Sequence, residues 1–271
     1  MKAPSGHTAV RAQKRPRGQR DAALPWQTHE LFPTPPWATR ALFENVFPAM
    51  GLPAVDRSRA IWEPCAGLRH MADVCEEYSR VVIASDVCVY DETLDVRMFD
   101  FVGGPVQQAP GIDAGWIITN PPFGLAADIF ERARCLLSGE PHGGIALLLR
   151  LSWLEGADRF ERIFSRAPPT VFAPFAERVP MCEGGYDPAG STATAYAWFV
   201  WRIEDGLVAR TPNSLPFFPT FVIPPGRREA LTRASDRRLA ARHVPGWVAP
   251  STLKASGKDQ DWLDLVGGKL S

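Results

Sequence analysis

The sequence lacks a net charge, a long apolar run and the cysteine pattern of a metal-binding or disulfide-bonded protein. Its 271 residues include 30 Lys and Arg against 30 Asp and Glu, and a typical apolar run, Ile145–Leu149, is short. That run is far shorter than the ~20 residues of a membrane-spanning helix, so no membrane partner is expected. The five cysteines form no CxxC pair and have no histidine partners at zinc-finger spacing, which argues against a structural zinc site.

A secretory signal is also missing, because no apolar stretch with a small-residue cleavage site follows the basic start of the chain. We therefore expect a cytoplasmic protein with reduced cysteines. Residues 1–23 carry almost no large apolar side chain, which predicts a basic disordered tail. Residues 24–211 are predicted to form a single folded domain. Residues 212–271 are predicted to be a Pro-rich extended segment followed by a basic, poorly ordered C-terminal tail.

Short β-branched runs alternate with segments of helical period from Ala60 onward, which is typical of an α/β fold. We predict a doubly wound, mostly parallel, seven-stranded sheet in one domain. The runs that read as strands are Ala60–Glu63, Arg80–Ser85, Trp116–Thr119, Gly144–Leu151, Thr170–Arg178 and Thr194–Ile203. The segments that read as helices are Pro35–Met50, His70–Tyr78, Leu125–Leu137 and Gly156–Arg166.

The first chemically informative stretch is the turn Glu63-Pro64-Cys65-Ala66-Gly67, which follows a predicted strand. Small residues in such a turn let the backbone approach a ligand at the carboxyl edge of the sheet. Asp86 ends the next predicted strand, where an acidic residue accepts hydrogen bonds from ribose hydroxyls. The chain lacks the GxGxxG pattern that binds a pyrophosphate, which disfavours a nicotinamide-dependent dehydrogenase. A tight turn beside a solvated aspartate is the alternative interpretation.

The second stretch is Asn120-Pro121-Pro122-Phe123, which ends the apolar strand Trp116–Thr119. The prolines cannot continue the sheet, so an amide oxygen, prolyl carbonyls and an aromatic ring are left at the strand's tip. The oxygen of Asn120 and the carbonyl of Pro121 can accept both hydrogens of a planar NH2 group, while Phe123 stacks on its ring.

These segments resemble motifs I, II and IV of class I S-adenosylmethionine-dependent methyltransferases that modify exocyclic or amide nitrogens. Upstream, Phe32-Pro33-Thr34-Pro35-Pro36-Trp37 resembles motif X of adenine-N6 DNA methyltransferases, and the order X, I, II, IV resembles their gamma arrangement. Two longer strings, Leu147–Gly156 and Gly190–Trp201, together with Glu177–Met181, resemble the phage and prophage branch of that family. The resemblance covers roughly Leu31 to Trp201.

The resemblance implies a Rossmann-like catalytic domain and S-adenosyl-L-methionine as cofactor. It places in the cofactor pocket Thr34, Glu63, Cys65, Gly67, Asp86, Asp100, Phe101 and Asn120. It assigns the target base, and hence catalysis, to Asn120, Pro121, Pro122 and Phe123. The implied reaction is direct methyl transfer to the N6 amine of a flipped adenine in DNA, with no covalent enzyme intermediate. One departure is Arg69, which stands where many relatives have a second glycine and can narrow the cofactor site.

The Gly- and Pro-punctuated loop between the last two predicted strands is a candidate nucleic-acid contact. There Arg178 would meet a phosphate, Tyr186 a base face, and Ser191 and Thr192 polar edges. A plain surface connection is the equal alternative. Cys65 and Cys182 are read as small buried thiols rather than nucleophiles.

Three alternatives to DNA adenine methylation stay open. RNA or a protein glutamine amide could be the substrate, although relatives acting on glutamine or guanine usually have Tyr where Phe123 stands. A cytosine-N4 enzyme would more often have Ser in place of Asn120. A non-catalytic nucleic-acid-binding relative, with a cofactor site impaired by Arg69, is the third.

The zero net charge is a sum of unlike parts. Residues 1–20 carry six basic and no acidic residues, whereas residues 21–226 carry 15 Arg, no Lys and 25 acidic residues. The remaining residues carry nine basic and five acidic ones. The basic residues near the two ends could bind DNA phosphates in a salt-sensitive manner, which the acidic residues 21–226 do not favour. The alternative is that both ends are merely solvated tails.

Overall fold

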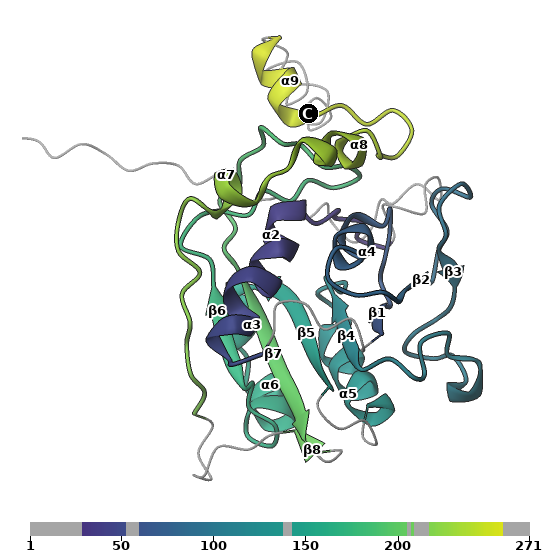
Figure 1. Ribbon diagram of the computed structural model, residues 1–271, viewed down its shortest axis with the longest axis vertical. Helices are drawn as coiled ribbons and strands as arrows, with labels where there is room; N and C mark the ends of the chain where they lie inside the picture. The colour runs from purple at the N-terminus through teal and green to yellow at the C-terminus, as the bar shows by residue number, and fades with distance from the viewer. Residues whose placement is uncertain (1–28, 53–59, 138–142, 205–206, 209–216, 257–271) are drawn as a thin grey trace, which may run out of the picture.

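A central sheet dominates the computed structural model, which describes residues 29–52, 60–137, 143–204, 207–208 and 217–256 (Figure 1). Within these residues seven strands lie in the order β3-β2-β1-β4-β5-β7-β6, and β8 also pairs with β7. Neighbours from β3 to β5 are parallel, whereas β7 is antiparallel to β5, β6 and β8. The strands are β1 (Ile61–Glu63), β2 (Val82–Asp86), β3 (Arg97–Met98), β4 (Trp116–Thr119), β5 (Gly143–Arg150), β6 (Val171–Pro174), β7 (Tyr196–Glu204) and β8 (Leu207–Val208).

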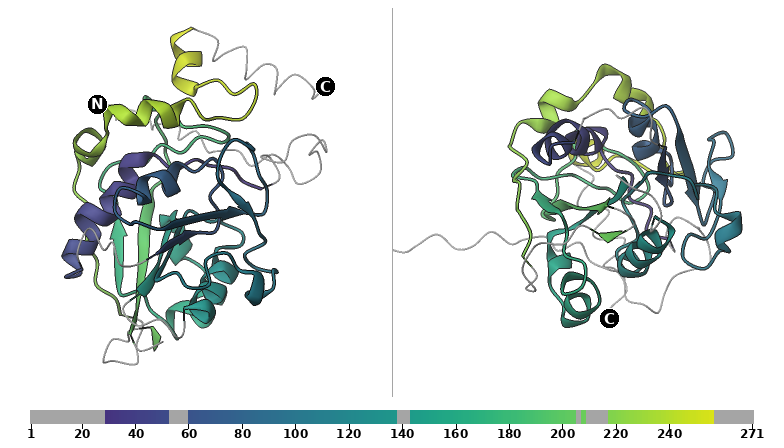
Figure 2. Two further views of the ribbon diagram at one scale, coloured as in Figure 1. Left: turned by 45° about the vertical axis from the view of Figure 1, so that its right-hand side comes forward. Right: turned by 60° about the horizontal axis from the view of Figure 1, so that its bottom comes forward.

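Helices cover both faces of the sheet (Figure 2). One face packs on α2 (Pro36–Ala41), η1 (Leu42–Val46), α3 (Phe47–Ala49) and α4 (His70–Cys75). The other packs on α5 (Ala126–Leu136) and on η4 (Phe160–Phe164), which directly follows the short helix α6 (Ala157–Arg159). Ile118 belongs to the first apolar cluster and its neighbour Ile117 to the second, as the alternation of a strand buried on both sides requires. The predicted doubly wound, Rossmann-like fold is therefore confirmed.

Each of the six predicted strands overlaps an observed one, while β3 and β8 were not predicted. Both have only two residues, which is too short for a periodic signal, and both residues of β3 are exposed. The predicted helix Pro35–Met50 is continuous from α2 to α3, with η1 as a π-helical turn in its middle. Single-turn π-helical insertions of this kind interrupt otherwise regular helices.

The sheet has its switch point between β1 and β4. From β1 the chain passes through α4 to β2 on one side, while β4 pairs with the other side of β1 and leads through α5 to β5. Open α/β sheets bind ligands in the crevice outside the carboxyl ends of the strands at such a point. The residues that follow β1, β2 and β4 therefore meet at one edge.

The C-terminal segment is more regular than predicted where it is described. Residues 217–223 are extended, as expected, and form backbone bridges with β6. The absence of any later element was wrong, because short helical turns follow and bury Leu231, Leu239 and Val244. They are α7 (Arg227–Leu231), η5 (Ala234–Asp236), α8 (Arg237–Ala240) and α9 (Pro250–Ala255). The predicted tail 1–23 and the boundaries at 24 and 211 lie outside the described residues.

Arg40 ties this C-terminal segment to the helices beneath it. Its side chain is 1% exposed and pairs bidentately with Asp236, with N–O distances of 2.7 Å, and with Glu77. The guanidinium also donates to the carbonyl of Leu231 at 2.7 Å. A buried guanidinium whose donors are satisfied in this way fixes three parts of the chain relative to one another: α2, the end of α4 and the C-terminal segment.

Replacing Arg40 with methionine should lower the free energy of unfolding by about 3–5 kcal/mol, because buried Asp236 loses its counter-charge. Urea denaturation measures the change. Arg162→Met is the matched control, since Arg162 also pairs with several carboxylates but lies on the surface, where such pairs contribute little. Equal losses in the two variants would contradict a special role for Arg40.

Candidate cofactor and substrate site

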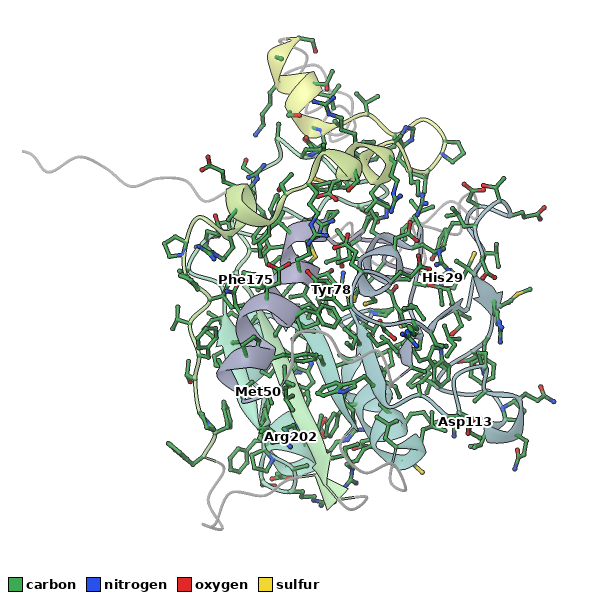
Figure 3. The ribbon with its side chains drawn as sticks, in the orientation of Figure 1. His29, Met50, Tyr78, Asp113, Phe175 and Arg202 are labelled. Atoms are coloured by element: carbon green, nitrogen blue, oxygen red, sulfur yellow. The ribbon has the colours of Figure 1, made fainter. Side chains whose placement is uncertain are left out.

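A cavity of about 360 Å³ lies at the carboxyl ends of β1, β2 and β4. His29, labelled in Figure 3, is one of the residues that line it. The structure brings together here all eight residues predicted for the cofactor: Thr34, Glu63, Cys65, Gly67, Asp86, Asp100, Phe101 and Asn120. Their common position follows from the topology, because most of them stand at or just after the carboxyl end of a parallel strand or on the segment that crosses that edge.

Gly67 stands at a point of the cavity wall where only glycine fits. Its φ is +50°, and a Cβ at this position would lie 2.6 Å from a methyl carbon of Leu31. Its N–H donates to Oδ2 of Asp86 at 2.8 Å. The turn after β1 is thereby fixed to the end of β2, and any side chain larger than hydrogen would be both strained and crowded.

Asp86 is held by backbone donors on both oxygens. Oδ2 accepts from Gly67 and Oδ1 accepts from the N–H of Cys88 at 3.1 Å. Burial raises the pKa of Asp86, while these two donors act in the opposite direction. A carboxylate oxygen has a second lone pair, so Asp86 can still accept hydrogen bonds from a ligand's hydroxyls.

The charge of the cavity wall is of one sign. Four carboxylates line the cavity, from Glu30, Glu63, Asp86 and Asp100, and none of its lining residues is Lys or Arg. Glu63 is 2% exposed, and its Oε2 has no hydrogen-bond partner among the described residues. Burial raises its pKa well above the usual range. Such a wall favours a cationic or hydroxyl-bearing ligand and offers no Lys or Arg side chain to a phosphate.

Arg69 does not line this cavity, so the possibility that its side chain narrows the cofactor site is not realised. It is not among the lining residues, because its guanidinium is bonded to Asp73, Glu76 and the carbonyl of Asp95. Its φ of +62° lies in the left-handed region that glycine adopts easily. The backbone thus keeps the conformation expected of a glycine while the side chain leaves the site.

Asn120 is fixed by its nitrogen. Nδ2 donates to the carbonyl of Phe32 at 3.0 Å and to Oγ1 of Thr34 at 3.1 Å, and lies 3.6 Å from the sulfur of Met181. A carbonyl only accepts, so this contact identifies the nitrogen and leaves Oδ1 on the other side. The amide oxygen remains an available acceptor at the tip of β4.

Phe123 lies beside the cavity rather than in its wall. Of the predicted catalytic residues, Asn120 and Pro122 line the cavity, whereas Pro121 and Phe123 do not. The Phe123 ring contacts two aromatic rings, those of Phe32 and Tyr196, and the guanidinium of Arg150.

The loop after β6 does not present the surface predicted for it. Tyr186 is 3% exposed and packs edge-on against His70, so the prediction that it offers a free face to a base is wrong. The cause is the C-terminal segment, which covers the loop through a bond from Val244 N to Gly184 O and two bonds from Ser251 to Asp187.

The other loop residues predicted to meet nucleic acid are more accessible than Tyr186. Arg178 and Ser191 are exposed and Thr192 is half-buried. None of the three lines the cavity, so the structure does not join them to the cofactor residues.

The two cysteines considered as nucleophiles lie in environments that oppose ionisation. Burial raises the pKa of Cys65 well above its usual range and that of Cys182 to about 11. Thiolate is the reactive form of cysteine, so neither side chain is prepared to act as a nucleophile at neutral pH. Both side chains are half-buried rather than buried, and the raised pKa values agree with the interpretation that neither is a nucleophile.

His70 is a lining residue that the sequence did not single out. It begins α4, is 2% exposed, and its Nε2 lies 2.8 Å from the carbonyl of Leu239 in α8. The carbonyl requires a hydrogen on Nε2, which fixes the tautomer. Burial lowers the pKa of His70 to about 4. The cavity wall therefore depends on a contact with the C-terminal segment that no local pattern reveals.

Comparison with known proteins identifies neither a sequence family nor a curated relative, since no family description and no curated protein matches the chain. Solved structures do resemble it. A type I restriction-modification system methyltransferase subunit from Streptococcus thermophilus is 11% identical, with 68% of this chain and 46% of that chain covered and a TM-score of 0.46. This chain thus spans about half the length of that subunit.

Two further structures are described as methyltransferases of other kinds. A predicted O-methyltransferase from Agrobacterium tumefaciens is 14% identical, with 81% and 96% of the two chains covered and a TM-score of 0.41. A tRNA (m1A58) methyltransferase from Aquifex aeolicus is 12% identical, with 65% and 70% covered and a TM-score of 0.38. In the described part of the chain, no helix combines the length and apolar character needed to cross a bilayer.

His70 should make folding sensitive to mild acid. The folded protein holds His70 neutral down to about pH 4, whereas the unfolded chain protonates it near 6.5. The unfolded state therefore binds more protons between these values, so the free energy of unfolding falls as pH is lowered from 6.5 to 4, by ~3 kcal/mol from this group. Urea unfolding at pH 7, 5.5 and 4.5 should show a steeper decline for the wild type than for His70→Gln.

His243→Gln is the control for this comparison, because His243 is exposed and stacks on Trp247. It should leave the pH dependence unchanged. Parallel curves for the wild type and His70→Gln would show that His70 is protonated as readily in the folded state as in the unfolded one.

Proposed function

We propose that this chain is an S-adenosylmethionine-dependent methyltransferase that transfers a methyl group to the exocyclic N6 amine of adenine in DNA. The observation that carries the proposal is an acidic cavity, free of Lys and Arg in its wall, that meets the fixed amide of Asn120 at the end of β4. The first feature suits a cationic cofactor, and the second suits an amine substrate.

The cavity fits this cofactor better than it fits a dinucleotide. S-adenosylmethionine carries a sulfonium and an ammonium group and no phosphate, so a wall with the acidic side chains of Glu30, Asp86 and Asp100 and without Lys or Arg favours it. Asp86 would accept hydrogen bonds from the ribose hydroxyls. Phe101, which is buried against Trp62, and the neighbouring Asp100 would hold the adenine end. Glu63, Thr34 and Asn120 would lie toward the methionine end.

The cofactor, when bound, would supply an electrophilic methyl group. Asn120 Oδ1 and the carbonyl of Pro121 would accept the two hydrogens of the substrate amine and turn its lone pair toward that methyl. The substrate nitrogen would gain the methyl group and release one of its two protons to water, so that one hydrogen stays on it. The chain needs no nucleophile of its own for this reaction, so its contribution is positioning and electrostatics.

DNA is favoured as substrate by the charge of the segment beside the cavity. Residues 217–256 contain seven basic residues and two acidic ones, and this segment reaches the cavity wall at His70 and Leu68. Exposed arginines such as Arg237 and Arg238 could meet phosphates on either side of a flipped nucleotide. Adenine is favoured by the resemblance, which pairs Asn120 with phenylalanine at position 123.

The decisive test is incubation with labelled S-adenosylmethionine and separate pools of unmethylated DNA, RNA and protein. Mass spectrometry of the digested products then identifies the modified atom. N6-methyladenine in the DNA pool is the expected product. Label in RNA or in glutamine would replace the proposed substrate, and an absence of cofactor binding by calorimetry would leave a non-catalytic nucleic-acid-binding protein.

Replacing Asn120 with alanine should lower the turnover of DNA by about 100-fold or more, since the substrate amine loses its acceptor. Cofactor affinity, measured by calorimetric titration, should fall far less than turnover, because the acidic side chains of the cavity remain. Undiminished methylation by this variant would refute the mechanism.

Replacing Asp86 with alanine should weaken cofactor binding about tenfold or more, because charged hydrogen bonds to the ribose are lost. Asp113→Ala is the matched control: Asp113 is exposed, is labelled in Figure 3, and does not line the cavity. Titration calorimetry compares the two variants. The same affinity in both would remove Asp86 from the site.

A further inference from the structure

Arg150 occupies the face of the ring on which a substrate base would stack. It is the last residue of β5, whose preceding residues are all buried, and it pairs in register with Tyr196 of β7. Its guanidinium carbon lies 4.3 Å from the centroid of the Phe123 ring. The aromatic neighbours Phe32 and Tyr196 are 6.5 and 6.2 Å away and tilted by 42° and 39°, so the cation is the group stacked closely on Phe123.

This cation has no carboxylate partner among the described residues, and its Nε is buried without a hydrogen bond there. The arginines that bind the fold together differ in this respect. Arg40, Arg69 and Arg233 each pair with two carboxylates. The guanidinium of Arg150 bonds to the neutral side chain of Tyr196, so its positive charge is not balanced by that contact. A partly desolvated cation of this kind next to a candidate base site favours the arrival of an anion.

We propose that Arg150 covers the Phe123 ring while the site is empty and moves to a backbone phosphate when the target base takes its place. The proposal rests on the proposed function, in which Phe123 receives the base. A guanidinium is planar and delocalised, so it can stack on the ring in the manner of a base. A flipped nucleotide brings its base and its flanking phosphates to the site together, so it displaces the cation and supplies its new partner in one step.

The test measures how the affinity for DNA depends on salt, using a fluorescent duplex from the DNA that the wild type methylates. Each phosphate neutralised by the protein contributes about 0.9 to the slope of log affinity against log salt. Arg150→Gln should therefore reduce the magnitude of that slope by about 0.9 and weaken binding about tenfold near physiological salt. Arg150→Lys, which keeps the charge, should retain the slope.

The matched control is Arg159→Gln. Arg159 is also half-buried and lies over an aromatic ring, 5.9 Å from the centroid of Trp153, but it donates to the carbonyl of that tryptophan and lies outside the cavity wall. It should keep the wild-type slope. A purely structural role for Arg150 would alter stability in Arg150→Gln and leave the salt slope at the wild-type value, which would overturn the proposal.

A second measurement tests whether Arg150 covers the ring in the empty site. Adenosine has the base but no phosphate, so its methylation should rise about threefold or more in Arg150→Gln, which no longer competes for Phe123. An unchanged or lower rate would overturn this part. If the wild type methylates DNA but Arg150→Gln keeps the wild-type salt slope, the role of Arg150 is refuted and the proposed function stands. Failure of the wild type to methylate DNA refutes the proposed function and with it the role of Phe123.

Discussion

The buried contact between Arg40 and Asp236 is the interaction on which the rest of the architecture depends. It joins the first helix of the sheet's cover to a turn 196 residues later, and Glu77 completes the pair from the end of α4. Residues 217–223 run along the outer edge of the sheet beside β6. The residues that follow them then pack over α2 and α4. His70 then finds its acceptor in Leu239, and the loop around Tyr186 is buried. One ion pair thus fixes both the outer layer and part of the cavity wall.

Much of the site could be predicted from local sequence, because the geometry of a parallel sheet does the assembling. Glu63, Asp86 and Asn120 each stand at or just after the end of a strand, and parallel strands present those ends at one edge. Apolar runs identify the strands and turn residues identify their ends. For this reason these three residues could be placed at one edge from the sequence, whereas Thr34, Asp100 and Phe101 were assigned to the pocket by the family resemblance.

The failures have a different physical origin. The short helices between Arg227 and Ala255 carry at most one buried apolar residue each, so their stability comes from contacts made across the chain rather than from a periodic pattern. Tyr186 was expected at the surface because its own neighbours are turn residues, and it is covered by a segment more than 50 residues away. Arg150 did carry a local signal, a single charge that ends a buried strand, although that signal does not say what the charge contacts.

Arg69 shows what the second glycine of this motif is needed for. The position demands a left-handed backbone, which costs a non-glycine residue about 1–2 kcal/mol, and does not demand an empty space toward the ligand. Here three polar partners outside the cavity, Asp73, Glu76 and the carbonyl of Asp95, offset that strain. The motif can therefore diverge at this glycine by recruiting acidic residues on the following helix. A search for distant members of such folds gains by accepting an arginine there when carboxylates follow four and seven residues later.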